Sequence, residues 1–515
     1  MAVLYNIGCV GSSPGLAIRK HQTGNGPSLH AIFNNLLKGG KTPTRHLHDA
    51  PAIRCGGVVA TAIFLTLHVD MSTAASFEIF DGQVETTQQI LGDGETGIIH
   101  AGGTLQPSAY RDALLVTGAG ASINNEGSIR SRAAGITVLA SDATVVSSGQ
   151  IDTTGSSDGI ALDGPNASLT VSGTINTLGN YSHGIAVSEV GTTVVASGGI
   201  DTAGYFASGI YSSTGNVILR NSGSIHTAGF DASGIESSVR SFPDPLLLGP
   251  RTSVVAVDLY NGGLIQTDGD RSNGIGSYFS NSAVASSTSS VPVKNASAAS
   301  DTVIINRGNI HTLQNAAMGI SSSSRSFAKS EVADGKAVAA DSVTVINSGN
   351  IRTDGESSQG IDLNADATSS GTRSSASVTG DIENQGSIRT NGKYAPAIYA
   401  ALDAISFSIG QVSASARITN TGEIETREYD SSGMQARVDT RHLDSGATPG
   451  GLASGIAGSS IALVNESNIT TRGEVSSGVR SAASAFAEGL DETANTNVAI
   501  VNSGHVRSSG SFASG

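Results

Sequence analysis

The sequence predicts an all-β chain folded as a right-handed parallel β-helix, and three observations lead to this prediction. A short phrase, Asn-x-Gly-x-Ile-x-Thr followed by a Gly-Ile pair, recurs along the chain. The chain has 65 Gly, no Trp and 4% aromatic residues, yet 38% of its residues are hydrophobic. No segment sustains the apolar spacing i, i+3, i+4, i+7 of an amphipathic helix. A core of small and β-branched residues, rebuilt in every coil, accounts for all three observations.

The repeated phrase sets the period of the predicted coils. Clear copies are NSGSIHTAGFDASGI (221–235) and NSGNIRTDGESSQGI (347–361). Spacings between early copies are 22 to 25 residues, the length of one β-helix coil with Gly-marked corners. Ile and the Thr two positions later share one face of a strand, so stacked coils place Ile on Ile and Thr on Thr. The Ile of the phrase, or Val in its place, occurs at 129, 151, 175, 200, 225, 265, 310, 351, 388, 424, 469 and 506, which predicts about twelve rungs.

Later coils carry long insertions between the Gly-Ile pair and the next phrase. Their spacings rise to between 36 and 45 residues. The insertions are rich in Ser and Ala and end in alternating runs such as DSVTVIN and SSIALVN. Because alternation is typical of strands, we expect stacked β-extensions along one side of the rod. Loops and insertions on rigid scaffolds often carry function, so this side is a candidate binding face.

The Asn that opens the phrase is the most regular polar residue of the repeat. An amide is both donor and acceptor, so stacked copies can form a ladder of hydrogen bonds, with a ligand array as the alternative. We expect the ladder. Its members are Asn125, Asn221, Asn261, Asn306, Asn347, Asn384, Asn420, Asn465 and Asn502.

The N-terminal segment has the features of a signal peptide. Basic residues precede GGVVATAIFLTLHV (56–69), an uncharged run too short to span a bilayer as a helix. Small residues follow, and we expect cleavage near Ala74 or Ala75. A buried helix of a small N-terminal domain is the alternative. Both cysteines, Cys9 and Cys55, precede this point, so a disulfide-free rod must rely on repetition for its stability.

The segment QVETTQQILGDGETGIIHAGGTLQ (83–106), followed by GASINNEGSIRS (120–131), resembles the start of many bacterial autotransporter passengers. The phrase likewise resembles the repeats of adhesin-like passengers. This resemblance implies export through the periplasm and outer membrane of a Gram-negative bacterium to the cell surface or medium. It also implies an outer-membrane translocator barrel after the last coil, which this chain lacks, so we expect a truncated solenoid whose open end associates with other copies.

These features divide the chain into four expected regions. Residues 1–75 form the extended signal-peptide region, and 76–124 the N-terminal cap and first coils. Residues 125–235 form the short-period rungs. Residues 236–515 form the long-period rungs with insertions, ending in an incomplete coil.

Searches for catalytic or metal-binding patterns find little. Ser445 in LDSGAT, near His442, lacks the Gly that precedes a chymotrypsin-like nucleophile. His226 and His311 share a rung position and are expected to be solvent-facing polar residues. Neighbouring Asp491 and Glu492 are expected to be solvated charges. We therefore expect no catalytic, cofactor or metal site.

The sequence favours a non-catalytic surface rod that acts in adhesion or self-association, with a host or neighbouring cell surface as its partner. A polysaccharide-acting β-helix enzyme, such as a lyase or phage-spike hydrolase, is the alternative, although aromatic platforms and carboxylate clusters look sparse. A haemagglutinin-like exoprotein is a third possibility. The net charge of −14 argues against a nucleic-acid partner.

Overall fold

The computed structural model describes residues 6–9, 16–19, 75–241, 251–285, 295–332, 335–443, 455–488, 492–512 and 514. The chain divides into two compact units, Met1–Val69 and Asp70–Gly515. In the first unit, β1 (Asn6–Cys9) and β2 (Leu16–Arg19) pair antiparallel. The described residues contain no helix that is long and apolar enough to cross a membrane.

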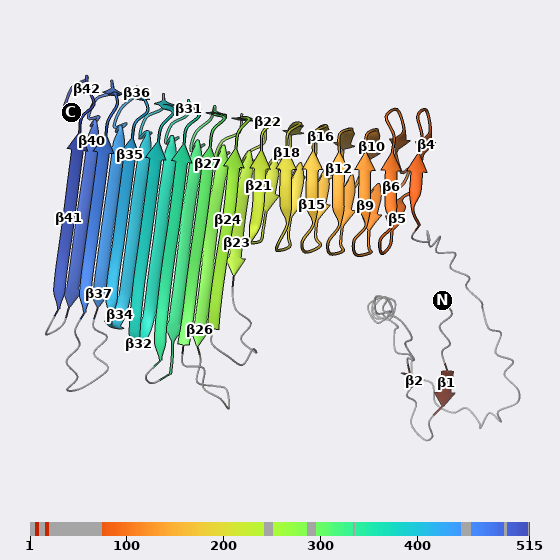
Figure 1. Ribbon diagram of the computed structural model, residues 1–515, viewed down its shortest axis with the longest axis horizontal. Helices are drawn as coiled ribbons and strands as arrows, with labels where there is room; N and C mark the ends of the chain where they lie inside the picture. The colour runs from red at the N-terminus through yellow and green to blue at the C-terminus, as the bar shows by residue number, and fades with distance from the viewer. Residues whose placement is uncertain are drawn as a thin grey trace, which may run out of the picture. The chain divides into compact units, whose positions relative to one another are not determined.

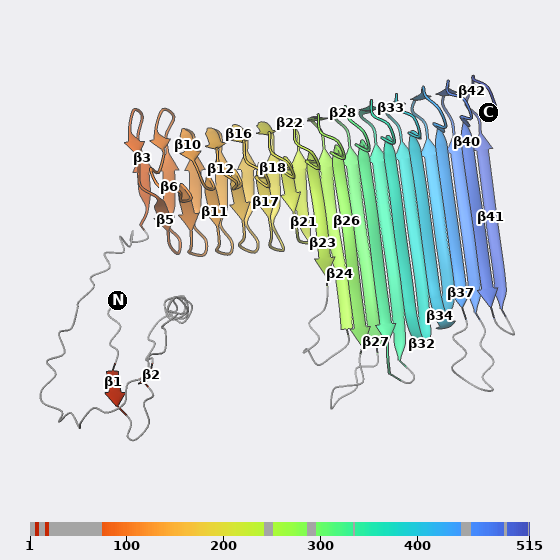
Figure 2. The same cartoon turned by 180° about the vertical axis from the view of Figure 1, so that it is seen from behind.

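The second unit is a parallel β-helix, which confirms the predicted fold class (Figures 1 and 2). A coil contains three short strands, such as β16 (Thr174–Thr177), β17 (Ile185–Val187) and β18 (Thr193–Ala196). Each pairs in parallel with its counterpart in the next coil. The first strands of the coils form one 14-stranded sheet, and the second and third strands belong to a 26-stranded sheet. Together the three faces enclose the core.

The 14-stranded sheet contains the Ile and Thr of the phrase. From β13 to β39, each Ile pairs with the Ile of the next coil and each Thr with the next Thr. For example, Ile225 pairs with Ile265, and Thr227 with Thr267. Its strands are β4 (Val84–Glu85), β7 (Thr104–Leu105), β10 (Ser128–Ser131), β13 (Gln150–Thr153), β16, β19 (Gly199–Thr202), β22 (Ser224–Thr227), β25 (Leu264–Thr267), β28 (Asn309–Thr312), β31 (Asn350–Thr353), β33 (Ser387–Thr390), β36 (Ile424–Thr426), β39 (Ile469–Thr471) and β42 (Val506–Ser508).

The two side faces begin as short strands. Those before β17 are β3 (Phe77–Ile79), β5 (Gln89–Leu91), β6 (Thr96–Ile99), β8 (Leu114–Val116), β9 (Ser122–Asn125), β11 (Ile136–Val138), β12 (Thr144–Ser147), β14 (Ile160–Leu162) and β15 (Ser168–Val171). The next coil contributes β20 (Ile210–Ser212) and β21 (Val217–Asn221).

The buried Thr of each phrase stabilises the corner that follows it. Thr267 Oγ1 donates a hydrogen bond of 2.6 Å to the carbonyl of Ser272, and Thr177 makes the equivalent bond of 2.7 Å to Ser182. The chain reverses within these five residues. The reversal uses a left-handed residue six positions after the Ile, for example Asp231 with φ 51°. We infer that Thr recurs because its hydroxyl closes the corner while its methyl group packs in the core.

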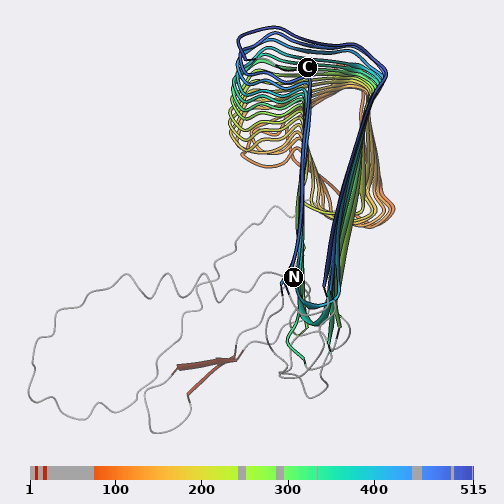
Figure 3. The ribbon, with the colours of Figure 1, turned by 90° about the vertical axis from the view of Figure 1, so that its left-hand side faces the viewer.

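From β23 onward, the strands of the two side faces lengthen and project beyond the core as two layers (Figure 3). This double-layered extension confirms the predicted stack of β-extensions. Its strands are β23 (Ile235–Ser241), β24 (Arg251–Asn261), β26 (Ile275–Ala285), β27 (Asn295–Asn306), β29 (Ile320–Ser330), β30 (Lys336–Asn347), β32 (Ile361–Asn384), β34 (Ile398–Ile409), β35 (Gln411–Asn420), β37 (Met434–Leu443), β38 (Ile456–Asn465), β40 (Val479–Glu488) and β41 (Thr493–Asn502).

Small side chains fill the space between the two layers. Buried Ala and Ser alternate with outward-facing residues along β27, β29 and β30. Asp341 is the exception, a buried carboxylate that accepts hydrogen bonds from the hydroxyls of Ser300, Ser324 and Ser326. Burial raises the pKa of Asp341 to about 6, although these hydroxyl donors oppose the rise. The carboxylate holds the layers in one register, at a cost in stability when it is ionised.

Ile351→Asp should destabilise the β-helix strongly. Ile351 is 1% exposed and lies between Ile310 and Ile388 in the Ile stack, so Asp would bury an unpaired carboxylate. We expect a loss of several kcal/mol in the free energy of unfolding. Ser357→Asp is the control, because Ser357 is a partly exposed corner residue with φ 55° that Asp tolerates, and it should change stability by only about 0.5 kcal/mol. Equal losses in chemical denaturation would contradict the rung register.

Asp341→Asn should alter how stability depends on pH. The folded pKa of Asp341, about 6, lies above its ordinary value of 3.8, so the folded state holds this proton more tightly than the unfolded state. Its contribution to stability is therefore present below about pH 4 and is lost as the pH rises through about 6. Asn does not ionise, so the melting temperature of the variant relative to the native chain should rise between pH 4 and pH 7.

The matched control for this experiment is Asp301→Asn, which removes a charge from an exposed position in the neighbouring strand. A difference in melting temperature between Asp341→Asn and the native chain that stays constant across this pH range would show that Asp341 does not titrate as its burial requires.

Candidate functional site

The Asn residues of the phrase form a hydrogen-bonded ladder inside the β-helix. Asn221 Nδ2 donates to Asn261 Oδ1 at 2.8 Å, and Asn261 donates in turn to Asn306 at 2.8 Å. The series continues through 347, 384, 420 and 465 to 502. From Asn221 to Asn384, each amide also donates to the carbonyl of the Gly two residues later. The backbone of the preceding coil lies so close to this Gly that a Cβ would clash with it, for example with the Gly198 carbonyl at Gly223.

The ladder does not include every predicted member. Asn125 donates instead to the Ser147 hydroxyl at 3.0 Å, and Val171 and Ala196 hold the equivalent positions of the next two coils. From Asn221 to Asn465 the side chains are almost fully buried. An external ligand therefore has no access to the amides along this stretch.

The remaining candidates of the sequence lie in different places. Ala74 and Ser445 lie outside the described residues, and the Ala75 amide donates to the Ile90 carbonyl at 3.2 Å. His442 is 0% exposed within the double-layered extension, and its Nδ1 lies 3.0 Å from Glu492 Oε1. The Glu492 side chain is 3% exposed, so its expected role as a solvated charge is wrong. The two layers enclose it with a histidine.

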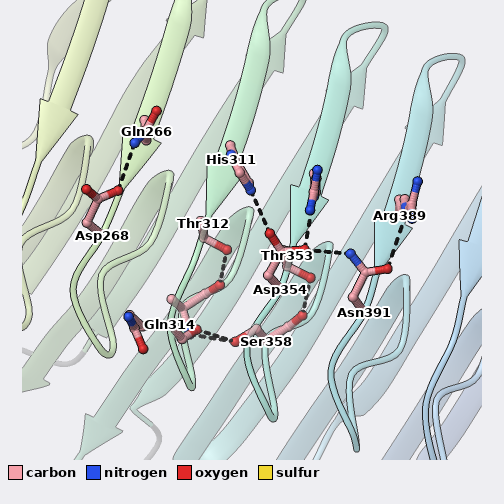
Figure 4. A network of polar contacts seen from close by, with 12 residues as sticks. Gln266, Asp268, His311, Thr312, Gln314, Thr353, Asp354, Ser358, Arg389 and Asn391 are labelled. Atoms are coloured by element: carbon pink, nitrogen blue, oxygen red, sulfur yellow. Dashed lines mark hydrogen bonds and ion pairs between the residues drawn. The ribbon is translucent and has the colours of Figure 1, made fainter.

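The outer face of the 14-stranded sheet carries a line of paired polar residues (Figure 4). His226 and His311 do occupy one rung position, with Gln266 between them. His226 Nε2 lies 3.0 Å from Asp268, and His311 Nε2 lies 2.8 Å from Asp354.

Hydrogen bonding on this face shifts the pKa values of His226 and Asp354. Burial alone would lower the pKa of His226, but its hydrogen bonds with Asp268 and Asp201 raise it above its usual value. Burial alone would raise the pKa of Asp354, but donors from His311, Arg352 and Asn391 lower it to about 2. Each carboxylate already has donors from its own sheet. The polar groups of this face therefore already have hydrogen-bond partners within the chain, which makes the face a poor candidate for ligand binding.

The corners between the 14-stranded sheet and the next face carry exposed aromatic rings. Tyr181 and Phe206 stack with ring centroids 5.0 Å apart, and Phe206 meets Phe230 edge to face at 5.9 Å. The Arg271 guanidinium lies 5.5 Å from the centre of the Phe230 ring. We call Tyr181, Tyr205, Phe206 and Phe230 the aromatic stripe. Its rings come from three successive coils and lie side by side because the coils stack in register.

A groove of about 560 Å³ lies beside the aromatic stripe, on the outer surface of the second strands. Its lining combines Phe206, Arg271 and Asn273 from the corners with Glu236, Tyr278 and Asp362 from the following strands. We call it the corner groove. Asn273 hydrogen bonds the Tyr278 hydroxyl, and Glu236 accepts a bond of 2.9 Å from Ser208. Five successive coils contribute residues to it.

The electrostatics of the corner groove are mainly acidic. Burial raises the pKa of Glu236, and it raises that of Asp362 to about 6 and that of Tyr278 to about 12. The one cation of the lining, Arg271, is engaged by Asp231 at 3.2 Å. Ionisable groups with shifted pKa values in a concave surface are typical of binding or catalytic sites. In the described part of the chain, no three His, Cys, Asp or Glu side chains are grouped to hold a metal ion.

The sequence reasoning missed this groove because it judged aromatic platforms and carboxylate clusters to be sparse. Aromatic and acidic residues are few in the sequence, but the stacked coils bring several of them together at this groove. A usable signal was present: Phe230 and Tyr205 lie five residues after the Ile of the phrase, and Tyr181 and Phe206 lie six after it. Aromatic residues at fixed positions of successive coils must lie together once the coils stack.

Comparison with known protein families supports this architecture. The model of the BigA third pectate lyase-like domain matches residues 87–368, more than half of the chain. The matched segment includes the short-period coils, the aromatic stripe, the corner groove and the first coils of the double-layered extension. Comparisons with curated proteins and with solved structures found no match. The chain therefore belongs to the family of the BigA third pectate lyase-like domain, a bacterial surface-protein domain.

Proposed function

We propose that this chain is the rod of an exported bacterial surface protein, that it acts by binding rather than by catalysis, and that its partner is a host or neighbouring cell surface. The family supports surface display. The resemblance of the repeats to autotransporter passengers supports export through the periplasm and outer membrane, with a translocator barrel as the partner in export. The observation that carries the binding role is the aromatic stripe beside an open groove on a rigid scaffold.

The spacing of Glu236 and Asp362 argues against one form of the alternative, a glycoside hydrolase that uses these two acids as its carboxyl pair. Glu236 pairs with Gly276, Gly276 with Ser321, and Ser321 with Asp362. Three coil steps of about 4.8 Å separate the two acids by roughly 14 Å along the axis. Glycoside hydrolases hold their carboxyl pair about 5 to 9.5 Å apart. Glu236 and Asp362 are therefore too far apart along the axis to act as such a pair.

Beads coated with the full chain should attach to cell monolayers or bacterial cells more than beads coated with the heat-denatured chain. The expected reason is that the binding surface requires stacked coils, which heating removes. Counting attached beads by microscopy measures the effect. Equal attachment of both bead types would contradict a role in adhesion.

The full chain should release no new reducing ends from neutral or uronic polysaccharides, because Glu236 and Asp362 are too far apart to act together on one glycosidic bond. A sensitive reducing-sugar assay over many hours is the measurement. Turnover that is present in the native chain and lost in Asp362→Asn would overturn the non-catalytic proposal and favour the enzyme alternative.

A further inference from the structure

We propose that the corner groove binds an uncharged oligosaccharide, with Phe206 as the stacking platform and Tyr278, Asn273 and the groove carboxylates as hydrogen-bonding partners. This inference rests on the proposed binding function and names its ligand class.

The aromatic stripe combines a strained backbone with partly exposed rings. Tyr181 and Phe206 occupy the left-handed corner position, with φ 59° and 57°. This conformation costs an L-residue with a bulky side chain about 1 to 2 kcal/mol. Other coils place Asp, Ser, Ala, Arg, Val, Tyr or Phe there. Tyr181 is 65% exposed and Phe206 is 38% exposed, so both leave apolar ring surface in water. Strained residues that leave apolar rings in water are typical of ligand platforms.

The floor of the corner groove offers fixed hydrogen-bonding groups. The Tyr278 side chain is largely buried, and its hydroxyl is held by Asn273. Glu236 is oriented by Ser208, and Asp362 by Asn364 at 3.0 Å. A carboxylate accepts several hydrogen bonds at once, so each acid retains capacity for a ligand hydroxyl after these contacts. The groups are therefore preorganised for a ligand rich in hydroxyls.

The charge of the groove selects among saccharides. Glu236, Asp362 and Asp231 line it, whereas its one cation, Arg271, already pairs with Asp231. A chain of uronic acids would bring further carboxylates against this excess of negative charge, and like-charge contacts cost affinity. Uncharged sugars avoid the repulsion, and their hydroxyls donate to the acids. The pectate lyase-like family name therefore describes the fold of this domain, while the groove disfavours pectate-like polyanions.

A sugar ring also fits the combination of surfaces. The C–H face of a pyranose is apolar and flat, and it packs against an aromatic ring, while its edge carries hydroxyls. The groove places Phe206 and Asn273 at the corners and Tyr278 and Asp362 along the neighbouring strands. A helical or extended apolar peptide would need a continuous apolar surface, and the polar floor interrupts one here.

Calorimetric titration of the full chain with defined hexasaccharides tests the proposal. The probes are uncharged hexamers of glucose, xylose, mannose and N-acetylglucosamine, and the hexamer of galacturonic acid. At least one uncharged hexamer should bind, and the galacturonate hexamer should bind at least tenfold more weakly. Absence of binding by all uncharged probes, or preference for galacturonate, would overturn the inference.

Phe206→Asn is the informative variant, because Asn favours the left-handed conformation and should fold at least as stably as the native chain. It should weaken binding of the uncharged hexamer at least tenfold. Tyr394→Asn is the matched control: Tyr394 is an exposed aromatic at the same corner position, φ 54°, but outside the corner groove. Unchanged affinity in Phe206→Asn, or an equal loss in the control, would show that the stripe is not the platform.

The double variant Glu236→Gln and Asp362→Asn tests the charge argument. Both substitutions keep the shape and one acceptor oxygen of each side chain while removing its charge, and they should raise the affinity for the galacturonate hexamer relative to the uncharged one. An unchanged ratio would contradict the charge argument. If coated beads attach to cells although no uncharged hexamer binds, the adhesive function stands and only the ligand class fails. If uncharged hexamers bind but coated beads do not attach, the ligand class stands and the adhesive function fails.

Discussion

The in-register pairing of each coil with the next is the interaction on which the rest of the structure depends. A coil has few hydrogen bonds of its own. Its backbone amides donate to the neighbouring coil, as the Ile185 amide does to the Gly209 carbonyl at 2.9 Å. Because the side-chain period of a strand is two residues, a shift of one residue would turn Ile225 and its counterparts outward. The residues of the repeated phrase stabilise that register.

Different parts of the coil secure the register in different ways. The Ile stack contributes apolar burial, the Thr hydroxyl closes the corner, and the Asn amides join successive coils through bonds of about 2.7 Å, as between Asn347 and Asn384. An amide in this ladder is satisfied only when its neighbour is at the same level, so a slipped coil leaves a buried polar group without a partner. The ladder begins at Asn221, next to the coil in which the extension begins. Long strands have more alternative registers than short ones, and a polar ladder at their base excludes the wrong ones.

Much of the fold follows from the sequence because recurrence in a solenoid translates directly into contact. The Ile, Thr and Asn positions, the parallel pairing and the stacked extensions are all visible in the spacing of the phrase. The burial of Glu492 against His442 could not be predicted from the sequence. It depends on two layers whose facing residues are separated by turns of variable length. Asp341 was missed for the same reason. To predict the corner groove, one must know both which positions recur in each coil and which later coils form the floor of the groove. The positions of Phe206 and Tyr181 within the coil were readable, but the floor formed by Tyr278 and Asp362 comes from later coils.

The central claim, that equivalent positions stack in register, is tested most directly by engineered disulfides. The rod has no cysteine of its own beyond Cys55, so with Cys9 and Cys55 replaced by Ser any disulfide reports the introduced pair. Gln266 and His311 are direct partners on the outer face, about 4.8 Å apart, which suits a disulfide. Gln266 and Arg352 are two coils apart, about 9.6 Å, beyond the reach of a disulfide. Mild oxidation should link Cys pairs at 266 and 311 rapidly and leave pairs at 266 and 352 unlinked, as measured by thiol titration. Rapid linkage at 266 and 352, or none at 266 and 311, would contradict the stacked register.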